Sequence, residues 1–224
     1  MSKQAIYLMP GLAANPKIFE YLSFPDEYQV YPMHFIIPEK EESLSHYTQR
    51  LIHEQIKHEN PILLGVSFGG MIVQEMSRQI PVKKLILIST VKSNKEFSPF
   101  FNKAFEYKLY NFFPSRALAY VELLEKISFP SRFKQKMKLY KKYMDKLPKE
   151  YFDWAIKRVL FWNQEEFPTT PFIHIHGEND KVFPVKYINQ PVTIIKNARH
   201  DMIIFRAKWF NENWNEILNI PTNE

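Results

Sequence analysis

The scarcity of glycine constrains this chain more than any other feature of its sequence. The 224 residues include only five glycines, and three of them lie in one short run, Gly-Val-Ser-Phe-Gly-Gly at positions 65–70. The other two, Gly11 and Gly177, each follow an apolar run that predicts a strand. Glycine permits a sharp turn or a close approach of the backbone to another group. We therefore expect three special loops, all just past strand ends, where open α/β sheets bind ligands.

Short apolar strands and helices are expected to alternate along most of the chain. The expected strands are residues 4–9, 28–35, 61–64, 85–89, 172–176 and 192–195. The expected helices are residues 15–22, 43–57 (with Ser43 as the N-cap), 68–79 and 203–218. This alternation predicts a parallel sheet covered by helices, which is the α/β class.

The alternation stops at residues 92–165, where only helical patterns interrupted by prolines are found. This segment carries a local charge of +8, from 16 Lys and Arg against 8 Asp and Glu, and holds 18 of the 35 aromatic residues. The composition predicts a division into a core of residues 1–91 and 166–224 and a helical insertion of residues 92–165.

Length and composition limit the number of domains, the cellular location and the cysteine chemistry of this chain. A chain of this length suits one domain with a sizeable core. No apolar run is long enough to span a membrane, and the first residues lack the features of a signal peptide. The absence of cysteine excludes disulfides, cysteine nucleophiles and cysteine-ligated metals. We expect a cytoplasmic protein without a membrane span.

Ser67 lies between a predicted strand and a predicted helix, in the pattern Gly-x-Ser-x-Gly. A sharp turn there would project the serine hydroxyl outward, and Gly65 and Gly69 would give the crowded turn the room it needs. The Phe68 N–H, at the helix start, could donate to a developing oxyanion. The pattern favours a nucleophile over the alternative, a purely structural turn.

With these loops, nearly the whole chain resembles the α/β-hydrolase family. Residues 10–12 (Pro-Gly-Leu) look like the family's oxyanion loop, although the family often has His-Gly where this chain has Pro-Gly. The resemblance implies the Leu12 N–H as the second oxyanion donor. It also implies a mostly parallel sheet of about six strands that lacks the family's first two strands. The insertion at residues 92–165 would be a helical cap.

The same resemblance assigns the acid and the base. Residues 176–180 (His-Gly-Glu-Asn-Asp) match a His-Gly-x-x-Asp loop, which implies Asp180 as the acid; the alternative is a loop-capping aspartate. His200, between the last predicted strand and helix, occupies the place of the general base. The order Ser67, Asp180, His200 is the order of this family. Asp201 is better explained as a surface or helix-start residue.

Other chemistry-bearing residues leave alternatives open. His174 and His176 share one face of a strand, which suits packing or pocket lining better than metal binding, because no third ligand has a telling spacing. The basic run from Lys134 to Lys142 suits a solvated helix face, with attraction of an anionic substrate as the alternative. No nucleic-acid-binding module matches. The aromatic candidates for lining a cap pocket are Phe100, Phe101, Phe105, Phe112, Phe113, Trp154, Phe161 and Trp162.

These residues predict a serine hydrolase that cleaves a carboxylic ester or thioester of a small, partly apolar substrate through an acyl-enzyme at Ser67. The chemistry requires no metal and no organic cofactor. Two alternatives stay open, because one fold supports many functions. The same triad could serve a lyase or a carbon–carbon bond hydrolase, or the chain could be a ligand-binding protein without catalysis.

Overall fold

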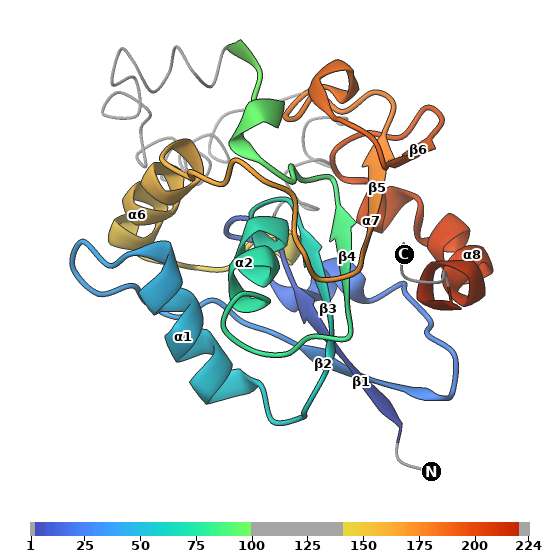
Figure 1. The fold of residues 1–224 in the computed structure, drawn as a ribbon, viewed down its shortest axis with the longest axis horizontal. Helices are drawn as coiled ribbons and strands as arrows, with labels where there is room; N and C mark the ends of the chain where they lie inside the picture. Colours follow the sequence, from blue (N-terminus) through green and yellow to red (C-terminus); the bar gives the residue numbers. More distant parts are fainter. Residues whose placement is uncertain (1–2, 100–140, 220–224) are drawn as a thin grey trace, which may run out of the picture.

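The computed structural model describes residues 3–99 and 141–219. Its strands are β1 (Gln4–Met9), β2 (Tyr28–Pro32), β3 (Ile62–Val66), β4 (Lys84–Ile88), β5 (Phe172–Gly177) and β6 (Thr193–Ile195). They form one sheet in the order β2-β1-β3-β4-β5-β6, and all five pairings are parallel (Figure 1). The predicted α/β fold with a parallel sheet of about six strands is confirmed.

Helices cover both faces of this sheet. The α-helices in the described part of the chain are α1 (Leu44–Gln55), α2 (Phe68–Met76), α6 (Lys149–Leu160), α7 (Met202–Phe205) and α8 (Ala207–Asn219). Successive side chains of a strand point to opposite faces. Tyr7 and Met9 of β1 accordingly pack with α1, α2 and α6, whereas Ile6 and Leu8 pack with α7 and α8. Among the helices in the described ranges, none is long and apolar enough to cross a membrane.

The predicted insertion falls between β4 and β5, and its described part includes α6. Trp154 of α6 packs against Tyr47 of α1, with ring centroids 4.3 Å apart and the rings tilted by 41°. Its Nε1–H donates to the carbonyl of Glu42 at 2.7 Å. The two ends of the insertion meet, because the Asn94 N–H donates to the carbonyl of Gln164 at 2.7 Å. The boundaries of the insertion as a separate cap stay a prediction. Residues 100–140, with the aromatic candidates up to Phe113 and most of the basic run, lie outside the described residues.

Several predicted elements differ from those observed, and the helix expected at residues 68–79 ends at Met76. The strand expected at residues 28–35 ends at Pro32. The expected helix at 15–22 is a short 3-10 helix, Pro16–Phe19, whose first turn is capped by the Asn15 side chain. The single helix expected at 203–218 is two helices, because the backbone leaves helical values at Arg206 (φ −120°, ψ 21°).

Strand register brings the three glycine loops to one edge of the sheet. Met9, the last residue of β1, pairs with Gly65 near the end of β3, and Gly177 at the end of β5 pairs with Ile195 at the end of β6. β2 lies on one side of β1, and β3 and all later strands lie on its other side, so the connections from β1 and from β3 run in opposite directions. This topology leaves a crevice outside the carboxyl ends of β1 and β3. Such a crevice is where open α/β sheets bind ligands.

Candidate active site

The turn between β3 and α2 holds Ser67 in a strained conformation. Its backbone angles (φ 54°, ψ −121°) lie outside the regions that residues with side chains favour. Hydrogen bonds fix the turn: the Ser67 N–H donates to the carbonyl of Ile88 at 2.9 Å, and the Ser67 carbonyl accepts from the Thr90 hydroxyl at 2.7 Å. The hydroxyl of Ser67 does not cap α2, so it is available for another partner.

The glycines allow the backbone to pack closely against neighbouring backbone atoms, and none of them is needed for a positive φ. None of the five glycines has a positive φ, so the unusual backbone conformation falls on Ser67 itself. A methyl group on Gly65 would lie 2.7 Å from the Cα of Gly70. A methyl group on Gly69 would lie 2.9 Å from the carbonyl carbon of Met9. The turn therefore packs against its own helix and against β1 at distances that no side chain permits.

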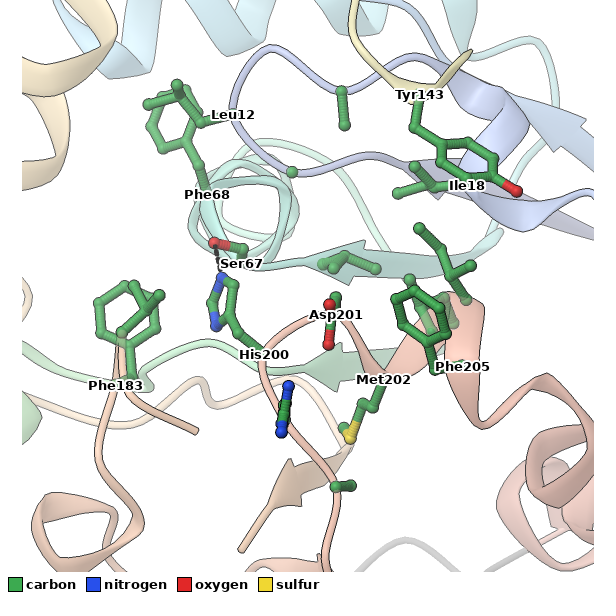
Figure 2. A pocket seen from close by; sticks show the side chains of 18 of the residues that line it. Leu12, Ile18, Ser67, Phe68, Tyr143, Phe183, His200, Asp201, Met202 and Phe205 are labelled. Carbon is green, nitrogen blue, oxygen red and sulfur yellow. Dashed lines mark hydrogen bonds between the residues drawn. The ribbon is translucent and has the colours of Figure 1, made fainter. Parts of the chain in front are cut away.

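The structure brings Ser67, His200 and Asp180 together, as the sequence predicts. The His200 Nε2 lies 2.9 Å from the Ser67 Oγ, and the His200 Nδ1 lies 2.8 Å from the Asp180 Oδ2 (Figure 2 shows the serine and the histidine). Ser67 comes from the end of β3, Asp180 from the loop after β5 and His200 from the loop after β6. Asp201, next to His200 in the chain, lines the neighbouring cavity instead.

Asp180 is placed to remain an anion. Its side chain is fully buried, and its Oδ1 accepts the backbone N–H groups of Val182 at 2.8 Å and Phe183 at 2.9 Å. Burial raises the pKa of Asp180, but the hydrogen bonds from His200 and Phe183 outweigh it, so the pKa lies below its ordinary value. An ionised carboxylate only accepts. The His200 proton therefore sits on Nδ1, and the Nε2 lone pair faces the Ser67 hydroxyl.

Leu12 and Phe68, the predicted oxyanion residues, both line the cavity next to Ser67 (Figure 2). The loop that carries Leu12 is bonded to the described end of the insertion. The Asn15 N–H donates to the carbonyl of Tyr143, and the Asp145 N–H donates to the carbonyl of Ala13, both at 2.8 Å. The position of this loop thus depends on residues more than 120 positions away in the sequence.

A cavity of about 1120 Å³ opens over Ser67. Figure 2 shows Leu12 and Phe68 on one side of the serine, and Ile18, Tyr143 and Phe205 on the other. Other apolar side chains that line it include Met144, Ile156, Val159, Leu160, Val182 and Met202. Apolar walls with a few polar groups are typical of a small-molecule site.

Within the described residues, the aromatic side chains predicted to line a cap pocket do not line this cavity. Trp154 and Trp162 are buried elsewhere, and Phe161 is exposed. The lining residues of α6 are Ile156, Val159 and Leu160, which share one helix face at spacings of three and four. Trp154 is turned toward α1 by its contacts there, so the adjacent, smaller side chains face the cavity.

One group of potential metal ligands among the described residues is already held by other hydrogen bonds. Glu39, Glu42 and His46 form a group with ligand-like spacing. The Nη1 of Arg50, however, donates to both carboxylate oxygens of Glu42, at 3.1 and 2.9 Å, and the His46 Nδ1 lies 2.7 Å from Glu42 Oε1. The guanidinium therefore takes the place that a cation would need.

The burial of Lys92 and Glu96 was not predicted from the sequence. Both side chains are fully buried, and the Lys92 Nζ lies 2.9 Å from the Glu96 Oε1. The available signal was a pair of opposite charges four positions apart, at the start of a segment where lysines are common. The two histidines on β5 are buried beside this pair, which agrees with the packing interpretation.

Solved structures with the same fold include several esterases. A thermophilic esterase from Thermogutta terrifontis is 15% identical, with a TM-score of 0.66, and the match covers 97% of this chain and 90% of that chain. A bromoperoxidase from Bacillus anthracis is 18% identical, with a TM-score of 0.67 and coverage of 97% and 92%. A carboxylesterase from Nitrososphaera gargenis is 17% identical, with a TM-score of 0.67 and coverage of 96% and 90%.

No curated protein matches the sequence. The family model described as the alpha/beta hydrolase fold matches residues 38–205, which is most of the chain and includes Ser67, Asp180 and His200. The parallel sheet and the strand-end loops described above agree with that match. The chain therefore belongs to the α/β-hydrolase fold family.

Proposed function

We propose that this protein is a serine hydrolase that cleaves carboxylic ester or thioester bonds. The single observation that carries the proposal is the hydrogen-bonded series of Ser67, His200 and Asp180 at the base of an apolar cavity. Such a series activates a serine hydroxyl, which is a weak nucleophile on its own. The esterases among the similar structures support an ester as the substrate bond.

In the first half of the reaction, the Ser67 Oγ attacks the carbonyl carbon while its proton moves to the Nε2 of His200. The imidazolium that forms is stabilised by the Asp180 carboxylate at 2.8 Å from Nδ1. The C–O or C–S bond to the leaving group then breaks, and His200 returns the proton to the departing oxygen or sulfur. The product of this half-reaction is an acyl-enzyme on Ser67.

The backbone N–H groups of Leu12 and Phe68 are the proposed donors to the carbonyl oxygen as it becomes negatively charged. Both residues line the cavity beside the serine, and Phe68 is the first residue of α2. The first N–H groups of a helix have no partner within the helix. Such donors stabilise the tetrahedral intermediate more strongly than the ground-state carbonyl.

In the second half of the reaction, a water molecule replaces the leaving group. His200 takes a proton from this water, the hydroxide attacks the acyl carbon, and the acid is released as Ser67 regains its proton. The cavity on either side of Ser67 is lined by apolar side chains, which suits a partly apolar acyl or alcohol group. We propose that the insertion acts as a cap that forms one wall of this cavity through Tyr143, Met144 and α6.

The proposal is tested by labelling the purified protein with a fluorophosphonate, followed by peptide mapping. We expect label on Ser67, loss of the label in Ser67→Ala, and slow labelling in His200→Ala. Ser77→Ala is the matched control, because that hydroxyl lies at the far end of α2 and donates to the carbonyl of Gln74 at 2.8 Å. A panel of p-nitrophenyl esters and acyl thioesters of increasing chain length then identifies the bond.

Two results would contradict the proposal. Absence of label on Ser67 in a folded protein would favour a ligand-binding protein without catalysis. Label on Ser67 without turnover of any ester or thioester would favour a lyase or a carbon–carbon bond hydrolase that uses the same triad.

A further inference from the structure

A buried ion pair lies behind the proposed triad and is linked to it by two histidines. Lys92 and Glu96 follow β4, and both side chains are completely buried. His174 and His176 lie on β5, the neighbouring strand, and are 2% and 0% exposed. None of these four residues takes part in the proposed reaction. Buried charges are costly, so their arrangement calls for a physical explanation.

The ion pair has well-defined hydrogen-bond partners. The Glu96 carboxylate accepts the Lys92 backbone N–H at 2.6 Å and the Asn189 N–H at 2.9 Å. Burial lowers the pKa of Lys92, and the adjacent Glu96 carboxylate opposes that effect. The Lys92 Nζ contacts Glu96 Oε1 at 2.9 Å, the Asn189 carbonyl at 2.7 Å and the His174 Nδ1 at 3.0 Å. An ammonium has three N–H donors and no acceptor, so Lys92 donates one hydrogen bond to each of these three atoms.

These contacts fix which nitrogen of each histidine carries the proton. The His174 Nδ1 accepts from Lys92, so its proton is on Nε2, which lies 3.4 Å from the His176 Nδ1. The His176 Nε2 lies 2.8 Å from the carbonyl of Phe183, which only accepts, so this nitrogen also carries a proton. The Asp180 Oδ2 lies 3.4 Å from the same nitrogen. The donors in the series therefore point from Lys92 toward the loop that carries Phe183 and Asp180.

The surroundings also keep both rings neutral. Burial, and next the charge of Lys92, hold the pKa of His174 well below its ordinary value. Burial lowers the pKa of His176 as well, although the Phe183 carbonyl and Asp180 oppose that effect. The charged and titratable groups that face the two rings are Lys92 and Glu96 after β4, Asp180 after β5 and His200 after β6.

We propose that His176 is a positioning residue for Asp180, and that Lys92, held by Glu96, sets the tautomers of His174 and His176. The His176 Nε2–H donates to the Phe183 carbonyl at 2.8 Å, and the Phe183 N–H donates to the Asp180 Oδ1 at 2.9 Å, so His176 fixes the loop that holds the carboxylate. Two backbone N–H groups on Oδ1 and the His200 Nδ1–H on Oδ2 then leave the carboxylate a single orientation. The inference rests on the proposed function, because positioning matters only if His200 acts as a base.

The first test is the NMR spectrum of the full-length protein labelled with 15N-histidine, which requires no substrate. We expect His174 and His176 to be neutral Nε2–H tautomers at about pH 7, and neutral His200 to carry its proton on Nδ1. An Nδ1–H tautomer at His176, or a His176 pKa at or above its ordinary value, would overturn the proposal. In Lys92→Met, His174 is expected to titrate at higher pH than in the wild type, because a nearby positive charge is lost.

The second test is the rate of fluorophosphonate labelling of Ser67 in three variants. His176→Phe removes the donor to the Phe183 carbonyl and is expected to lower the rate about fivefold, the loss expected from one hydrogen bond that holds the Asp180 loop. His176→Gln returns an N–H close to the Nε2 position and is expected to recover most of the rate. Lys84→Met is the matched control, since Lys84 is also a buried lysine but bonds the carbonyl of Leu218 at 2.9 Å.

The outcomes separate the two proposals. Equal rates in wild type and His176→Phe, an equal loss in Lys84→Met, or no recovery in a folded His176→Gln would each contradict positioning by His176. If the wild type itself is not labelled, the proposed function fails, and the NMR tautomers still decide whether the hydrogen-bond series exists. If His176→Phe does not fold, the wild-type tautomers and the His176→Gln rate decide the question.

Discussion

Asp180→Asn tests the proposed triad through the position of a single proton. The Asp180 Oδ1 accepts two backbone N–H groups, and its Oδ2 faces the His200 Nδ1 at 2.8 Å. An asparagine has one acceptor oxygen and one donor NH2, so it has two possible orientations. If the NH2 faced the backbone, two buried N–H groups would lose their acceptor, at about 1–3 kcal/mol each. The asparagine is therefore expected to keep its oxygen there and to turn its NH2 toward His200.

That orientation reverses the tautomer of His200. Its Nδ1 would accept from the asparagine NH2, so the proton would move to Nε2 and point at Ser67. A protonated Nε2 does not accept the serine proton. The expected loss of labelling rate is about 10⁴-fold, or ~5.5 kcal/mol of transition-state stabilisation, as for the corresponding change in other serine enzymes.

The assay is the pseudo-first-order rate of fluorophosphonate labelling, together with initial rates on the ester that the panel identifies. Circular dichroism and urea unfolding show whether the variant is folded, and 15N-histidine NMR shows whether His200 has become the Nε2–H tautomer. Asp201→Asn makes the same chemical change at the adjacent carboxylate, and we expect a far smaller loss. A folded Asp180→Asn that keeps a rate within tenfold of wild type would refute the tautomer argument.

Three further predictions follow from the packing and charges of the site. Gly65→Ala places a methyl 2.7 Å from a backbone Cα of α2, so the free energy of urea unfolding should fall by about 1–3 kcal/mol or more; an unchanged value would contradict the close packing. Thr90→Val removes the donor to the Ser67 carbonyl and should cost about 1 kcal/mol of unfolding free energy and slow labelling, whereas wild-type behaviour would show that the bond does not hold the turn. Burial lowers the pKa of His174 and His176 in the folded protein. Below about pH 6.5 the unfolded chain therefore binds protons at these histidines that the folded chain does not. The free energy of unfolding should fall there by up to ~1.4 kcal/mol per pH unit for each histidine. Unfolding curves between pH 8 and pH 5 measure this loss, and a flat profile in that range would contradict it.

The sequence was sufficient to predict that Ser67, Asp180 and His200 meet, because each has a local pattern at a strand end. Ser67 follows the short apolar strand β3 and precedes a helix, Asp180 follows β5 and His200 follows β6. Parallel strands bring their carboxyl ends to one edge, so the order of elements alone places these loops near each other. The geometry that joins them, 2.9 Å and 2.8 Å, agrees with that reasoning.

The pocket lining, the helix break at Arg206 and the burial of Lys92 depend on contacts with distant residues, so local sequence patterns did not predict them. The aromatic residues of the insertion were candidates for pocket lining, but Trp154 finds its partner in the Glu42 carbonyl and in α1. The break at Arg206 has no glycine or proline to mark it. The burial of Lys92 depends on Glu96, the Asn189 carbonyl and β5 together, and Lys92 has the same local sequence pattern as many solvated lysines.

Three of the six described non-glycine residues with positive φ lie in loops that carry a proposed functional group. Ala13, Ser67 and Asn197 have φ values of 58°, 54° and 56°. Such conformations persist only when surrounding contacts hold them. The Ser67 turn is held by Thr90 and the neighbouring strand, and the Ala13 loop is held by the backbone of residues 143–145. The inserted segment therefore contributes to the proposed oxyanion site directly, by fixing the loop that carries Leu12, in addition to forming a wall of the cavity.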